Sequence, residues 1–244
     1  MTHITRAGLP RQPPVAQSAF TGEPSPAPSP GITMIHVHAF ASPNSLKVPI
    51  ALEEMGIAYE LHAVNIRQGA QKSPSFTALN ANAKVPVLID EDAVDGPLVL
   101  SESAAILVYL AEAYGQLLPV AGIARARTFE QLFFHASALS PAYGQSGYFE
   151  KLAPERLPAA IERFHNEAIR TTAVLNGLLA VRPYVAGDTY TIADIAHFGW
   201  MWRRAFAGIE LASVPNVERW YNELAQRPAV VRAIARVDAL VPQP

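Results

Sequence analysis

Residues 84–89 have the sequence KVPVLI, a strand-like run of apolar residues with a proline at its entry. Proline has no backbone N–H and removes one hydrogen-bond donor from a sheet, which places Val85 and Pro86 at a turn or a sheet edge. The backbone just before the proline is then available to pair with something other than a neighbouring strand. This stretch is the third of four strand patterns in the first half of the chain.

The other elements of this half also follow strand or helix patterns. The side chains of residues 34–40 alternate between two sets, as they do on the two faces of a β-strand. A polar turn at 42–45 precedes apolar residues at helical spacing, which stop at Gly56. Pro49 is tolerable in such a helix only near its start, where an amide partner is missing anyway. The predicted elements are strands at 34–40, 58–64, 84–89 and 98–100, and helices at 46–55, towards residue 80 and at 104–114. Their order is β-α-β-α-β-β-α.

From Arg125 onward the pattern is helical only. Thr191 precedes an apolar run and Asp194 follows it by three residues, which is a capping box, so Asp194 is interpreted as structural rather than catalytic. The switch from mixed to helical patterns predicts an α/β domain packed on an all-α domain. We expect the first domain at residues 34–115, a linker at 116–124 and the helical domain at 125–244.

The composition excludes several classes of function. The chain of 244 residues carries 19 Lys and Arg against 21 Asp and Glu, a formal net charge of -2. It lacks the clustered positive charge on which nucleic-acid binding and polybasic membrane binding depend. It also contains no cysteine, which rules out a disulfide scaffold, a thiolate zinc site and a redox thiol supplied by the protein. Any thiol chemistry must therefore come from a ligand.

Residues 1–33 are predicted to be a proline-rich, disordered extension. Residues 1–31 hold seven of the 21 prolines and include the patch PSPAPSP at 24–30, too little apolar surface to offset the entropy of ordering. The segment lacks the apolar core of a signal peptide. The longest apolar run, at 104–111, is less than half of the roughly 18 residues that a membrane span needs. We therefore expect a cytoplasmic protein.

The whole pattern resembles the cytosolic glutathione transferases over about residues 34–240. The resemblance lies in the element order, the proline at the third strand, the Glu-Ser pair before the last helix of the first domain and the TIAD box. Finer phrases resemble the bacterial nu class, whose members are glutathione-dependent disulfide-bond oxidoreductases related to the fungal Ure2p-like proteins. These phrases are SPN at 42–44, GAQ at 69–71, NAKVP at 82–86, SESAAILVYLAE at 101–112 and AIERF at 160–164. The resemblance implies a thioredoxin-like domain packed on a helical domain, glutathione as cosubstrate and a homodimer.

Glutathione needs a site that holds charge at one end and stabilises a thiolate at the other. Ser42 and Asn44 lie between the first strand and the first helix, where their donors add to the positive end of the helix dipole. The nu class has a Thr-Pro-Asn turn here whose Thr and Asn contact the glutathione sulfur, and Ser42 keeps the hydroxyl. The resemblance thus implies Ser42 and Asn44 as catalytic residues, whereas the simpler interpretation is that Asn44 and Ser45 only cap the helix.

The resemblance also assigns residues to the rest of glutathione. The Val85-Pro86 bond matches the position where the family uses a cis-proline to present a backbone N–H and C=O to the cysteinyl part. Glu102 and Ser103 match the residues that take the ammonium and the carboxylate of the γ-glutamyl end. For the glycine carboxylate or a second glutathione, the candidates are Gln71 and Lys84.

Two further groups of side chains each have more than one interpretation. The family forms its second-substrate pocket from the first large helix and the loop after it, which implies Phe134, Tyr143 and Tyr148 as pocket residues, although such aromatic stripes also form cores. No metal site is predicted. His36 and His38 face one side of a strand with no third ligand or carboxylate nearby in sequence, so we expect them to pack or form hydrogen bonds.

The sequence therefore predicts a glutathione-dependent disulfide-bond oxidoreductase. In this hypothesis a bound glutathione thiolate attacks a disulfide substrate, and a second glutathione resolves the mixed disulfide. Two alternatives stay open. One is a transferase that conjugates glutathione to an electrophilic small molecule or cleaves aryl ethers, chemistry for which a serine at position 42 is also suitable. The other is a non-catalytic glutathione-binding protein whose proline-rich N-terminus recruits a partner.

Overall fold

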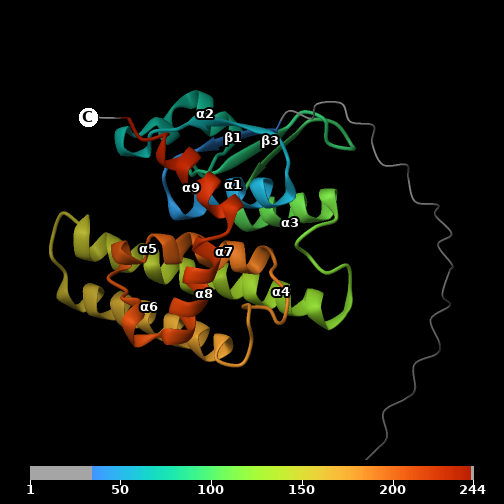
Figure 1. Cartoon of the computed structure of the whole chain (residues 1–244). Coiled ribbons are helices and arrows are strands. Elements are labelled where there is room, and N and C mark those ends of the chain that lie inside the picture. The colour runs from blue at the N-terminus through green and yellow to red at the C-terminus, as the bar shows by residue number, and fades with distance from the viewer. Residues whose placement is uncertain (1–34, 243–244) are drawn as a thin grey trace, which may run out of the picture. The chain divides into compact units, whose positions relative to one another are not determined.

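The structure of the chain is a computed structural model that describes residues 35–242 (Figure 1). The predicted disordered extension at residues 1–33 lies outside the described residues. The first strand begins at Ile35, so the predicted start at residue 34 also lies outside them.

A four-stranded mixed sheet forms the centre of the first domain. Its strands are β1 (Ile35–Ala39), β2 (Tyr59–Ala63), β3 (Val87–Asp90) and β4 (Leu98–Ser101), in the spatial order β2-β1-β3-β4. β1 runs parallel to β2 and antiparallel to β3, and β4 is antiparallel to β3. The accompanying helices are α1 (Pro43–Met55), α2 (Pro74–Leu79) and α3 (Ser103–Tyr114). α1 and α3 cover one face of the sheet and α2 the other (Figure 1), and the predicted element order is confirmed.

The second half of the chain is entirely helical. Its helices are α4 (Gly122–Phe134), α5 (Ser140–Lys151), α6 (Pro158–Leu179), α7 (Ile192–Trp202), α8 (Pro215–Ala225) and α9 (Pro228–Asp238). A π-helical segment, His135–Leu139, joins α4 directly to α5, so the loop expected after the first large helix is replaced by continuous helix. α4 begins at Gly122, inside the predicted linker. The predicted capping box of Thr191 and Asp194 is confirmed at the start of α7.

α1 is buried on all sides and connects the two halves. It packs against α3 and the sheet within the first domain and against α7 and α9 of the second, and nine of its 13 residues are buried. Pro49 lies in the interior of this helix rather than near its start. We attribute this tolerance to tertiary packing, which contributes most of the stability of a helix in a folded protein and here offsets one lost backbone hydrogen bond.

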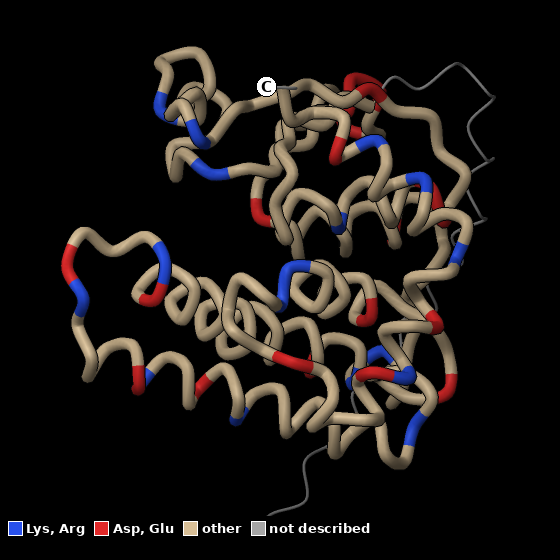
Figure 2. Tube along the Cα trace, turned by 60° about the vertical axis from the view of Figure 1, so that its left-hand side comes forward, with Lys and Arg blue, Asp and Glu red and all other residues tan. Residues whose placement is uncertain are grey.

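Ion pairs also tie α1 to the last helix. Arg227, which precedes α9, binds Glu54 with two hydrogen bonds of 2.6 and 2.8 Å, and Arg232 donates to Glu53 at 2.7 Å. Elsewhere, positions of both signs occur in each half of the described trace (Figure 2), although residues 90–112 carry only acidic charges. None of the described helices is both long and apolar enough to cross a membrane.

Candidate functional site

A small pocket lies where the start of β3 meets the first turns of α1 and α3. It is lined by Asn44, Asn80, Lys84, Val85, Pro86, Glu102 and Ser103. The peptide bond between Val85 and Pro86 is cis, as the family resemblance implied. Six of the eight residues predicted to bind glutathione or act on its sulfur thus line one pocket, the exceptions being Ser42 and Gln71.

The amide of Asn44 is held by a buried lysine. Lys47 Nζ donates to Asn44 Oδ1 over 2.8 Å and to Ser103 Oγ over 3.2 Å, and the Lys47 side chain is 1% exposed. Because the ammonium has only donors, it fixes the carbonyl side of the amide, which leaves the two N–H groups of Asn44 Nδ2 for other acceptors. Asn44 lines the pocket, so these donors suit an anionic ligand atom there.

The third contact of Lys47 crosses into the helical domain. Lys47 Nζ lies 2.7 Å from His135 Nε2, and the His135 ring meets the His197 ring edge to face at a centroid distance of 4.9 Å. Burial, followed by the charge of Lys47, holds the pKa of His135 well below its usual value, so its Nε2 accepts from the ammonium. Burial lowers the pKa of Lys47 to about 7, although the Glu102 charge opposes this shift.

A glycine allows α7 to approach this cluster. A Cβ atom on Gly199 would lie 2.3 Å from the backbone oxygen of Pro43 and 3.1 Å from Lys47 Cγ. No side chain fits at that distance, so the start of α1 and the middle of α7 touch only because residue 199 is glycine.

Ser42 caps α1, which corrects the interpretation that Asn44 and Ser45 are the caps. Ser42 Oγ accepts from the Ser45 N–H over 3.3 Å and donates to Ser45 Oγ over 2.9 Å. The single hydroxyl proton of Ser42 is therefore engaged. To donate to a sulfur it must rotate away from Ser45.

Glu102 is held in an unusual backbone conformation at the edge of the pocket. It precedes α3 with φ of 68°, a region that costs a non-glycine residue about 1–3 kcal/mol and that is found at functional sites. Its Oε1 lies 3.5 Å from Asn82 Nδ2. The neighbouring Ser103, 9% exposed, begins α3, whose free N–H groups attract a carboxylate.

The remaining predicted residues lie elsewhere. Gln71 belongs to a short 3-10 turn, Ala70–Lys72, and its Oε1 is buried without a hydrogen-bond partner among the described residues. Tyr143 is completely buried, and its hydroxyl shares a hydrogen bond of 2.6 Å with Thr172. It belongs to the core of the helical domain and has no exposed surface for a substrate, contrary to the prediction. The ring centroids of Phe134 and His197 lie 5.9 Å apart. Tyr148 is 43% exposed.

Sequence reasoning missed Lys47 and the role of the two histidines. The available signal was a single lysine in the otherwise apolar run at 46–52, three residues after Asn44. Lys47 therefore lies on the same side of α1 as Asn44. His135 and His197 are 88 and 150 residues away from Lys47 in sequence, so only the packed domains show their connection.

Comparisons with known proteins match both halves of the chain. The family model for the glutathione S-transferase N-terminal domain matches residues 41–113, and that for the C-terminal domain matches residues 152–228. The chain is 38% identical over 207 residues to the disulfide-bond oxidoreductase YfcG of Escherichia coli strain K12, covering 83% of this chain and 95% of that protein. It is 36% identical to the disulfide-bond oxidoreductase YghU of the same organism, covering 81% and 73% of the two chains.

Solved structures are similar over most of their length. A glutathione transferase family member from Pseudomonas fluorescens with two glutathione bound has a TM-score of 0.78 and 37% identity, over 85% of this chain and 95% of that one. A glutathione transferase from Pseudomonas putida, with one glutathione disulfide bound per subunit, has a TM-score of 0.77 and 35% identity, over 82% and 90% of the chains.

Proposed function

The chain belongs to the glutathione S-transferase family, and from that premise we propose that it is a glutathione-dependent disulfide-bond oxidoreductase. The observation that carries the proposal is the oriented Asn44 amide in the pocket that Val85 and Pro86 also line, in a chain without cysteine. The site offers donors for a ligand thiolate but no protein thiol, and two relatives bear the name disulfide-bond oxidoreductase.

The pocket residues divide between the two ends of glutathione. The Val85 backbone pairs with the cysteinyl part, and the first turn of α3 at Ser103 takes the γ-glutamyl carboxylate. Glu102 takes the ammonium beside it. Lys84, exposed at the pocket, and Gln71 remain the candidates for the glycine carboxylate or a second glutathione.

Lys47 and Asn44 act on the sulfur end. The Asn44 Nδ2 donors stabilise the thiolate, and the Lys47 charge behind them lowers the thiol pKa further. One glutathione thiolate attacks the disulfide and releases a substrate thiolate; the second attacks the mixed disulfide and releases the other. Two glutathione molecules become one glutathione disulfide, and the substrate disulfide becomes two thiols. The protein supplies position and charge while remaining unoxidised.

Turnover on two substrates tests this function. With glutathione in excess, we expect clear reduction of 2-hydroxyethyl disulfide and little conjugation of a chloronitrobenzene. Conjugation well above disulfide reduction would establish the transferase alternative instead. A crystal grown with glutathione disulfide tests the same site directly, since the disulfide sulfur atoms should lie within hydrogen-bonding reach of Asn44 Nδ2.

The accessory predictions remain part of this proposal. A homodimer is favoured by an apolar cavity of about 450 Å³ between α3 and α4, lined by Val108, Phe129 and Phe133 among others. Phe133 is 68% exposed beside it, a surface that a second copy would cover. Light scattering should give twice the monomer mass, and Phe133→Asp should give monomers. The cytoplasmic location and the domain boundaries of 34–115, 116–124 and 125–244 stay predictions.

The non-catalytic alternative rests on the proline-rich N-terminus. Deleting residues 1–31 tests it, because unchanged turnover and unchanged glutathione binding would remove the main support for a recruiting segment. Absence of turnover on any disulfide, together with intact glutathione binding, would favour the interaction protein.

Of the predicted second-substrate residues, Phe134 and Tyr148 remain candidates.

A further inference from the structure

Three histidines and two glutamates gather on the sheet face that carries α2. On β1, Ile35, Val37 and Ala39 are fully buried towards α1 and α3, so His36 and His38 project from the opposite face. The parallel register pairs His36 with Glu60 and His38 with His62. The third ligand that His36 and His38 lack in sequence is therefore supplied by β2, more than 20 residues later.

The donor atoms of three of these side chains converge on one point. His36 Nδ1 lies 2.9 Å from His62 Nε2, 3.3 Å from Glu60 Oε2, and His62 Nε2 lies 3.6 Å from the same oxygen. Ligands about 2.0–2.1 Å from a tetrahedral zinc ion are separated by about 3.3 Å. The three distances scatter around that value, so the three atoms have about the spacing of one face of a coordination tetrahedron.

We propose that His36, Glu60 and His62 bind a divalent transition-metal cation, with Zn²⁺ the best match. Two imidazoles and a carboxylate form a donor set that zinc uses in proteins, with the fourth position left to water or another ligand. A hydrogen bond between two imidazoles requires only their two nitrogens. It does not account for a carboxylate oxygen placed against both of them.

Neighbouring side chains lie against two of the ligands. Glu91 Oε1 lies 3.7 Å from His36 Nε2, on the ring nitrogen that a metal bound at Nδ1 would leave free. Carboxylates commonly lie beside the second ring nitrogen of a ligating histidine, and this one lies just outside hydrogen-bonding distance. His38 stacks on the His62 ring with centroids 4.9 Å apart. Two adjacent strands fix the ligands, so the site needs no movement of the backbone.

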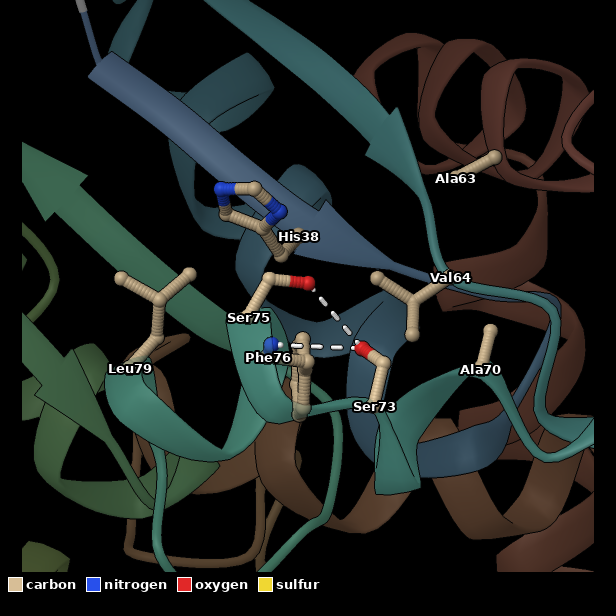
Figure 3. A pocket seen from close by; sticks show the side chains of 8 residues that line it. All are labelled: His38, Ala63, Val64, Ala70, Ser73, Ser75, Phe76 and Leu79. Carbon is tan, nitrogen blue, oxygen red and sulfur yellow. Dashed lines mark hydrogen bonds between the residues drawn. The ribbon is translucent and has the colours of Figure 1, made fainter.

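The site is separate from the glutathione pocket, with which it shares no residue. His38 leads from the cluster to a cavity of about 250 Å³ under α2, whose other walls include Ser73, Phe76 and Leu79 (Figure 3). A metal ion bound here would cross-link β1 and β2 on the sheet face opposite α1. The inference does not depend on the proposed catalytic function.

Metal titration of the full-length, tag-free chain tests the inference. After removal of metal with a chelator, Zn²⁺ is added in competition with a chromophoric chelator, and we expect saturable binding of one equivalent per chain. His62→Gln and Glu60→Gln should each weaken the affinity at least about tenfold. His165→Gln is the matched control, because His165 lies on α6 and contacts Ala207 O at 3.3 Å, and it should leave the affinity unchanged.

Two further readouts keep the outcome clear. The visible spectrum of the Co²⁺-substituted chain should be that of a tetrahedral site and should be lost in His62→Gln. Glu60 is 54% exposed as a side chain, so Glu60→Gln should fold even if another variant does not. Sub-stoichiometric binding, or an affinity that is the same in wild type, Glu60→Gln and His62→Gln, would overturn the proposal.

Discussion

Lys47 Nζ lies 2.8 Å from Asn44 Oδ1, so a charge buried in the second turn of α1 sets the orientation of an amide in the first turn. The same ammonium reaches Ser103 Oγ at 3.2 Å. One side chain thus joins the two helix starts between which glutathione is proposed to lie.

Replacing Lys47 by methionine should raise the pKa of the bound thiol and slow disulfide reduction. Hydrogen bonds to charged groups contribute about 1.5–3 kcal/mol, so kcat/KM should fall about ten- to a hundredfold. The thiolate absorbance of bound glutathione, followed against pH, gives the thiol pKa. Lys151→Met, at the exposed C-terminal end of α5, is the control and should match wild type in both quantities. An unchanged thiol pKa in Lys47→Met would remove the lysine from the mechanism.

The pH profile of kcat/KM should fall on both sides. Free glutathione loses its thiol proton near pH 8.5, which sets the rise. The pKa of Lys47 in the free protein is lowered to about 7 by burial, so the ammonium is lost as the pH rises through that value. The titratable groups that face the Lys47 ammonium are the Glu102 carboxylate and the imidazole rings of His135 and His197.

The rate depends on the fraction of Lys47 that is charged multiplied by the fraction of glutathione that is thiolate. This product is nearly constant between about pH 7 and 8.5 and declines outside that range. In Lys47→Met the decline at high pH should disappear, while the rise at low pH remains. Steady-state rates at low glutathione concentration, measured from pH 6 to 10, separate these outcomes. A high-pH decline that persists in Lys47→Met would have another source.

Asn44→Ala and Ser42→Ala should differ in what they lose. Asn44→Ala removes the oriented donors and should lower kcat/KM by about ten- to a hundredfold. It also takes one acceptor from the buried Lys47 ammonium, which should cost about 1–3 kcal/mol of folding free energy. Ser42→Ala removes the cap of α1 and should cost about 1 kcal/mol of folding free energy, with a smaller effect on turnover because the Ser42 proton is engaged with Ser45. Urea denaturation and kinetics on both variants test this. Equal kinetic losses would mean that Ser42 donates to the sulfur after all.

Gly199→Ala should disturb the site without touching glutathione. The added methyl would lie 2.3 Å from Pro43 O, so α1 and α7 must separate, at a cost of about 1–3 kcal/mol. We expect a lower melting temperature and a higher KM for glutathione. Gly177→Ala is the matched control, since a Cβ at that position of α6 meets nothing within 4 Å. It should stabilise the chain by about 0.5–1 kcal/mol.

Asp194→Ala should destabilise the helical domain severely. The carboxylate accepts from the Val185 and Thr191 N–H groups, each at 2.9 Å, and from Trp220 Nε1 at 3.0 Å. Each buried donor without an acceptor costs about 1–3 kcal/mol, so the loss should be at least about 3 kcal/mol. Thr191→Ala removes only the cap and should cost about 1 kcal/mol. Similar urea midpoints for the two variants would contradict this account.

The local elements of the fold could be predicted because each has its own signal in sequence. Alternation predicted β1, Gly56 predicted the end of α1, and Thr191 with Asp194 predicted the start of α7. The expectation that Pro49 lies near the start of its helix was wrong, because the helix tolerates an interior proline only through its packing against α3, the sheet, α7 and α9. Tyr143 was misassigned because the continuous helix through His135–Leu139 turns its side chain into the core, and spacing does not reveal a π-helical residue.

The candidate site likewise contains residues with a local sequence signal and residues whose partners are distant in sequence. Residues that occupy turns and helix starts, such as Asn44, Glu102 and Ser103, were found from local sequence and the family resemblance. Lys47 has the spacing of a core residue, and its partners come from another domain. The pairing of His36 with Glu60 and His62 depends on which strands become neighbours, a property of topology rather than of any short stretch.

The contact between Lys47 and His135 bears on how such a chain can be engineered. Residues 35–114 carry the whole pocket, yet grafting them onto the helical half of another relative would separate a buried ammonium from its histidine acceptor. A working chimaera must import His135, His197 and Gly199 together with the pocket. The two halves are therefore transferable only as a matched pair, and recombination between relatives should succeed where these three positions are shared.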